Sequence, residues 1–80
     1  MPLYFFDIQD RYAFSEDDVG VECETREKVR DTAFEALPGL ANSALSHGDH
    51  HTITVTVRDE AGTNVLRASL KMDADWLDRD

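Results

Sequence analysis

The sequence predicts an α+β fold: a two-layer sandwich in ββαββ order, with one long helix kinked at Pro38 on one face of a four-stranded, antiparallel-rich sheet. Three observations support this prediction. Aromatic and branched residues fill positions 3–8, and apolar and polar residues alternate over 51–59, as is typical of strands. Between them, apolar residues recur at helical spacing. The 80 residues leave room for a single domain, 1–80.

The first predicted strand covers residues 1–8, and the second covers residues 19–23. Alternation in the first strand turns one set of side chains toward the core: Tyr4, Phe6 and Ile8. The other set faces away: Leu3, Phe5 and Asp7. In the second strand the inward set is Val19, Val21 and Cys23. Gly20 has no side chain to pack, which indicates a bulge or a close backbone approach.

The predicted helix covers residues 25–46. Thr25 is suited to cap its first turn, and an apolar stripe continues as far as Leu45. Pro38 lies inside this stripe, where it lacks the N–H that a helix needs. Because the apolar period continues beyond Pro38, we expect a kink there and not the end of the helix.

The third and fourth predicted strands, 51–59 and 65–72, form a hairpin, with Gly62 placed for a turn that needs a positive φ. The acidic tail, 73–80, follows. The expected core gathers the inward-facing positions of the helix and the strands: Tyr4, Phe6, Ile8, Val21, Val29, Ala33, Leu37, Leu40, Ile53, Val55, Val57, Leu66 and Leu70.

The composition disfavours several partners. Eight Lys and Arg against 17 Asp and Glu give a net charge of −9, which repels nucleic-acid phosphates and anionic membranes. Cys23 is the single cysteine, so no intramolecular disulfide is expected. Without a signal peptide or a long apolar stretch, we expect a cytoplasmic protein.

The sequence offers one weak candidate for a metal site, formed by His47, Asp49, His50 and His51. Imidazole and carboxylate suit Zn²⁺ or Ni²⁺, but a strand that starts here sends His50 and His51 to opposite faces, so a solvated loop is the favoured interpretation. Cys23 is expected to be buried and unreactive. No catalytic constellation is found, so we expect neither an enzyme nor a cofactor.

Four segments resemble a family of short bacterial proteins of unknown function, known chiefly from rhizobia and related alphaproteobacteria. They are the opening M-P-x-Y-F-F-D-I, the acidic segment before Gly20, the helix from Ala33 to Pro38, and residues 55–62. The segment Gln9-Asp10-Arg11 departs from the Asp-Gly turn usual in that family, which predicts a longer or looser first hairpin. More distantly, the pattern is similar to the HicB-like antitoxin module. The resemblance implies a free-standing cytoplasmic protein and supplies no catalytic residues.

The function expected is a non-enzymatic protein-interaction module, with an antitoxin-like role as its most specific version. Its expected surface is Leu3, Phe5, Arg58, Arg67, Lys71, Trp76 and Leu77. The alternative is a small-ligand or single-stranded nucleic-acid binder around Phe5, with Arg58, Arg67 and Lys71 as its cations. Pairing of these cations with Asp7 and Asp59 would count against this alternative. Trp76 and Leu77 are costly to leave in water, so either the tail folds back over Phe5 or two copies meet. A homodimer is the favoured outcome.

Overall fold

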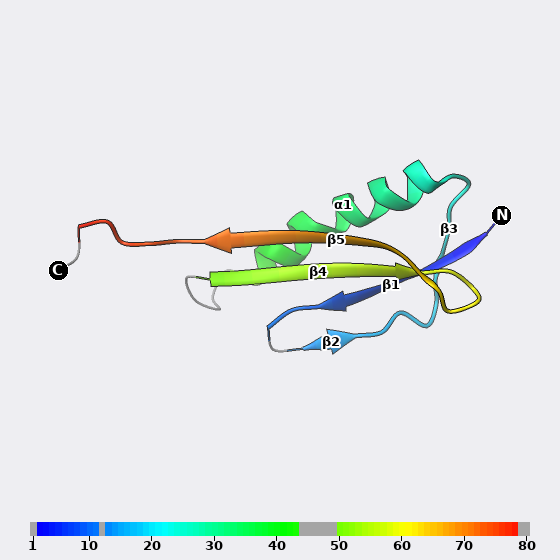
Figure 1. Ribbon diagram of the computed structural model, residues 1–80, viewed down its shortest axis with the longest axis horizontal. Helices are drawn as coiled ribbons and strands as arrows, with labels where there is room; N and C mark the ends of the chain where they lie inside the picture. The colour runs from blue at the N-terminus through cyan, green and yellow to red at the C-terminus, as the bar shows by residue number, and fades with distance from the viewer. Residues whose placement is uncertain (1, 12, 44–49, 79–80) are drawn as a thin grey trace.

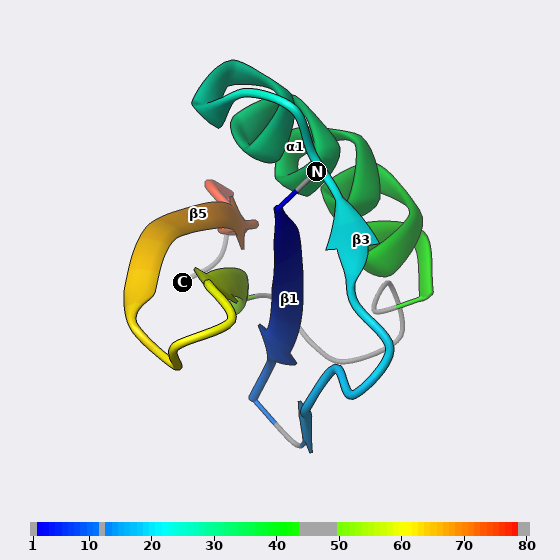
Figure 2. The same cartoon turned by 90° about the vertical axis from the view of Figure 1, so that its right-hand side faces the viewer.

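The computed structural model describes residues 2–11, 13–43 and 50–78 (Figure 1). In these residues a five-stranded antiparallel sheet is covered on one side by a single helix, which confirms the α+β class (Figure 2). The elements in chain order are β1 (Leu3–Gln9), β2 (Phe14–Ser15), β3 (Val21–Glu22), α1 (Arg26–Ser43), β4 (His50–Arg58) and β5 (Asn64–Asp73). The strand order is β2-β1-β4-β5, and β3 also pairs with β1.

The strand that returns after β1 is divided in two, so the prediction of four strands was wrong. Ile8 of β1 pairs with Ser15 of β2, whereas Tyr4 of β1 pairs with Val21 of β3. Gly20, with a φ of +84°, turns the chain directly before β3, so the alternation predicted over 19–23 is interrupted there. Val19 is therefore 79% exposed, contrary to the prediction.

The β1–β2 connection is held by two hydrogen bonds between Asp10 and Ala13. The backbone N–H of Asp10 donates to the carbonyl of Ala13 at 2.9 Å, and the Asp10 carboxylate accepts the Ala13 N–H at 2.7 Å. An aspartate at the start of a turn stabilises it through such a bond. Asp10 thus helps to close the connection without the usual Asp-Gly pair, and the longer or looser first hairpin stays a prediction.

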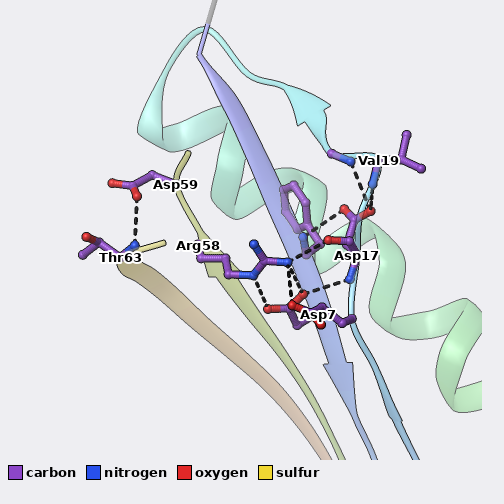
Figure 3. Close-up of polar contacts among 9 residues, drawn as sticks. Asp7, Asp17, Val19, Arg58, Asp59 and Thr63 are labelled. Atoms are coloured by element: carbon purple, nitrogen blue, oxygen red, sulfur yellow. Dashed lines mark hydrogen bonds and ion pairs between the residues drawn. The ribbon is translucent and has the colours of Figure 1, made fainter. Parts of the chain in front are cut away.

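The β4–β5 hairpin forms as predicted. Its register runs from His50 opposite Asp73 to Arg58 opposite Asn64, with an irregularity at Val57 and Arg58. In the turn, Oδ1 of Asp59 accepts the N–H group of Thr63 (Figure 3). The same oxygen accepts the N–H of Ala61, and Gly62 has a φ of +88°. The turn therefore combines a side-chain acceptor with a glycine in the left-handed region.

Helix α1 begins where the sequence predicts it. Oγ1 of Thr25 accepts the N–H of Lys28 at 3.1 Å, which is the expected N-terminal cap. The helix continues through Pro38 to Ser43, and the kink at Pro38 stays a prediction. Residues 44–46 of the predicted helix lie outside the described residues. No helix in the described part of the chain is long and apolar enough to cross a membrane.

The core lies between α1 and the central strands. Its buried apolar members are Cys23, Val29, Ala33, Leu37, Ala41, Ile53, Val55, Val57 and Ala68. The expected positions that are only half-buried are Tyr4, Phe6, Ile8, Leu40, Leu66 and Leu70. Helix α1 packs over β4 and β5, which leaves the side chains of β1 less covered. Val21, another expected core residue, is 41% exposed, so that prediction was wrong.

Candidate functional site

The face of the sheet opposite α1 carries a partly buried ion pair. Asp7 lies on β1 and is only 8% exposed, and Arg58 ends the neighbouring strand β4. Nε of Arg58 donates to Oδ2 of Asp7 at 2.8 Å, and Nη2 donates to Oδ1 at 3.3 Å (Figure 3). The guanidinium carbon also lies 4.8 Å from the centroid of the Phe5 ring. Arg58 is therefore held by a bidentate carboxylate contact and by an aromatic ring.

Asp17 joins this pair to the loop between β2 and β3. Its carboxylate accepts the backbone N–H groups of Phe6, Val19 and Gly20 at 3.0 to 3.1 Å. Its own N–H donates to Asp7 at 2.9 Å, and its carbonyl accepts Nη2 of Arg58 at 2.7 Å. The Asp17 side chain thus satisfies the N–H of Phe6 in the interval of β1 where neither β2 nor β3 pairs with it.

The acidic groups of this cluster are stabilised in their charged form. The hydrogen bond from Arg58 lowers the pKa of Asp7 more than burial raises it. Burial raises the pKa of Asp17, but the N–H donors of Phe6, Val19 and Gly20 together bring it below the ordinary value. The hydrogen bond to Asp7 raises the pKa of Arg58. Both carboxylates are thus engaged with donors, an arrangement suited to holding the loop in place.

Leu3 and Phe5 lie beneath this loop. A Cβ atom on Gly20 would come within 2.9 Å of the Leu3 Cγ and 3.1 Å of the Phe5 Cε1, so the Gly20 backbone touches both side chains. Leu3 and Phe5 are each half-buried in consequence. Phe5, which the sequence predicts to face away from the core, is therefore partly covered by the chain's own loop.

An open groove of about 550 Å³ lies farther along the same face. Arg11 and Lys71 line it together with Asp10 and Asp73, so charges of both signs meet there. Asp73 contacts Nδ1 of His50 at 2.9 Å and Nζ of Lys71 at 3.7 Å. The hydrogen bond with His50 lowers the pKa of Asp73. The mixed and paired charges give this groove no strong preference for an anion.

The histidines that suggested a metal site diverge. His50 is exposed beside Asp73 and Asp75, whereas His51 is buried on the helix face. His47 and Asp49 lie outside the described residues. Among the residues described, no three His, Cys, Asp or Glu side chains gather as ligands for a metal.

The two edges of the sheet differ in length. One edge is formed by β2 and β3, which have two residues each, and the other by β5, which has ten. Within the described part of the chain, no strand lies on the outer side of β5. An uncovered strand of this length presents a row of backbone donors and acceptors to other chains.

The segment after β5 leads away from the body of the molecule (Figure 1). It holds Trp76, 73% exposed, and Leu77, 95% exposed, so the tail does not fold back over Phe5. Arg67 and Lys71 lie on β5 itself, opposite Thr56 and Thr52 of β4. The predicted interaction residues therefore form two groups: Leu3, Phe5 and Arg58 under the loop, and Arg67, Lys71, Trp76 and Leu77 along the β5 edge and its continuation.

The sequence missed Asp17, although an Asp three residues before a Gly is a signal for a turn closed by a side chain.

Comparison with known proteins identifies a family. Residues 3–71 match a domain of unknown function, DUF6894, and the chain belongs to that family. This agrees with the expected small family of unknown function, although the match does not include Met1 and Pro2 of the opening motif. No curated protein and no solved structure matches the chain.

Proposed function

We propose that this member of the DUF6894 family is a non-enzymatic protein-interaction module that binds through the outer edge of β5 and the segment 74–78. The observation that carries the proposal is the ten-residue outer strand, which leads directly into the exposed Trp76. Together these features are called the β5 surface here. They offer a partner backbone hydrogen bonds and an aromatic anchor in one continuous stretch of chain.

The chemistry of this surface is that of strand addition. A partner strand that pairs with β5 gains main-chain hydrogen bonds, and side chains at alternate positions decide which partner fits. On one face these positions hold Arg67, Ser69 and Lys71, and on the other Ala68, Leu70 and Met72. Aromatic residues such as Trp76 are the side chains that most often anchor an interface.

A role without catalysis is supported by the state of the acidic groups. Asp7 and Asp17 accept hydrogen bonds from Arg58 and from the backbone, which leaves them poorly placed to act on a substrate. The alternative function is a small-ligand or single-stranded nucleic-acid binder around Phe5. It is weakened because Arg58, the cation beside Phe5, is already paired with Asp7. An antitoxin-like role is the more specific form of this proposal, in which the bound strand belongs to a toxin.

Site-specific photo-crosslinking in cells that make the protein naturally tests the proposal. A photoreactive amino acid at Ser69, on the β5 surface, is compared with one at Glu35, on the exposed side of α1. We expect a protein adduct from Ser69 that mass spectrometry maps to one extended segment of the bound chain, and none from Glu35. Adducts that form equally from both positions, or from Glu35 alone, contradict the proposal.

A further inference from the structure

We infer that the occupant of the β5 surface is a second copy of this chain. Two β5 strands pair antiparallel about a two-fold axis, with Leu70 opposite the partner's Leu70, and each Trp76 docks beside α1 of the other copy. The inference rests on the proposed function and adds to it the partner, the register and the anchor. Two-fold pairing also covers the β5 edge of both copies, so the assembly is closed at a dimer.

Charge complementarity on the open face favours this register. Residues directly opposite in an antiparallel pair share a face, so the registers that keep both helices on one side differ in steps of two residues. In the register proposed, Arg67 faces the partner's Asp73, and Lys71 faces the partner's Ser69, each twice by symmetry. If the partner strand is shifted by two residues in one direction, Arg67 lies opposite the partner's Lys71. If it is shifted by two residues in the other direction, Lys71 lies opposite the partner's Lys71. Like charges placed directly opposite destabilise a strand pair.

Arg67 is well suited to this contact. Its side chain is exposed, and no ion pair joins it to another residue in the described part of the chain. Asp73 already contacts His50 and Lys71, but its side chain is 42% exposed and a carboxylate accepts several donors. The same register matches Met72 with the partner's Ala68 on the helix face. Leu70 and Met72, half-buried in one copy, therefore gain apolar neighbours.

Trp76 reaches a hollow in the other copy. If β5 continues by three residues, Trp76 lies opposite the partner's Asn64, beside the start of β5. There a small hollow of about 40 Å³ is lined by Tyr4, Arg26, Val29, Val65 and Leu66. The hollow accepts the edge of an indole ring, and the Arg26 guanidinium can lie against the ring face. The exposed tryptophan of one copy thus meets the uncovered apolar corner of the other.

The experiment measures association and rescue by charge exchange. Sedimentation equilibrium of wild type is compared with Arg67→Glu, with Arg67→Glu/Asp73→Arg, and with Lys28→Glu, an exposed helix substitution with the same change in charge. We expect a micromolar dimer, a Kd raised about tenfold or more by Arg67→Glu, and a Kd within about threefold of wild type in the double variant. Lys28→Glu should leave the Kd within the same threefold range.

Trp76 supplies a second readout because it is the single tryptophan. Its fluorescence should shift to shorter wavelength as wild type associates, and the shift should need higher protein concentration in Arg67→Glu. A wild type that stays at 9.0 kDa up to about a hundred micromolar overturns the inference, as does a dimer that the charge variants leave unchanged. A dimer without the fluorescence shift overturns the docking of Trp76. If wild type is monomeric while Ser69 crosslinks to a different protein, only the choice of partner fails and the proposed function stands.

Discussion

Asp17 shows how much a single side chain holds in place in this small domain. It accepts backbone N–H groups from Phe6, Val19 and Gly20, which no other group in the described residues accepts. Asp17→Ala should lower the free energy of unfolding by about 2 kcal/mol, because donors in a partly buried loop lose their acceptor. Asp18→Ala, at an exposed neighbour, should change it by less than about 0.5 kcal/mol. Equal effects of the two substitutions in urea unfolding would contradict this role of Asp17.

Gly20 combines a positive φ with close contact, and Gly39 has neither restriction. Alanine at position 20 must adopt a φ near +84° and meets Leu3 at 2.9 Å, so Gly20→Ala should cost about 2 to 3 kcal/mol. Gly39 lies in α1 with open space around its Cα, so Gly39→Ala should stabilise the protein by up to about 1 kcal/mol. Thermal unfolding of the Gly20→Ala and Gly39→Ala variants measures the loss of stability in the first and the gain in the second. A Gly20→Ala variant as stable as wild type is incompatible with the loop described here.

The sequence predicted which face of a strand a side chain occupies better than it predicted which residues that side chain contacts. Alternation correctly separated Asp7 and Phe5 from the core side of β1, because side-chain direction is a local property of a strand. The pairing of Asp7 with Arg58 depends on the register between strands 51 residues apart in the chain, which no local pattern fixes. Asp17 lies in the acidic segment before Gly20, and its role there could not be predicted, because the N–H groups that donate to it come together only once the loop is folded onto β1.

Among the elements, α1 contributes its apolar stripe to the core. Leu37 is 5% exposed on the packed side of the helix, and Phe34 is 54% exposed. Leu37→Ala should therefore cost about 3 kcal/mol, whereas Phe34→Ala should cost less than about 1 kcal/mol despite the larger side chain that it removes. Urea unfolding checks the difference, and the reverse order would mean that the helix presents a different face to the sheet.

Elements defined by local signals were predicted well. Helix α1 has a cap and a 3.6-residue period, and the β4–β5 hairpin has alternation and a turn glycine, all of which are local. The division of the second strand into β2 and β3 was missed, because two-residue strands carry too little alternation to be recognised. The order of the strands was also beyond the sequence, so the exposed β5 edge could not be foreseen.

At the scale of the whole molecule, stability should depend on the ionised state of its acids. Asp7 and Asp17 have pKa values below the ordinary 3.8 in the folded protein. Below about pH 5 the unfolded chain therefore binds protons that the folded protein does not. The free energy of unfolding therefore decreases as the pH is lowered. The net charge of −9 opposes this trend, because acidification relieves repulsion. At physiological ionic strength the screening length is about 8 Å, which weakens that repulsion more than it weakens partly buried pairs.

The acid dependence can be assigned to Asp17 with one neutral substitution. Asp17→Asn keeps an oxygen acceptor but does not titrate, so the variant should be less stable than wild type at pH 7 and lose less stability between pH 5 and pH 3. The stability lost by wild type in this window is present above pH 5 and disappears as the pH falls through 3.8 toward the folded pKa. Asp18→Asn should retain the wild-type slope. Urea unfolding at 0.15 M salt across this range measures the three slopes, and parallel curves for wild type and Asp17→Asn would show that the loop carboxylate is not what acid disrupts.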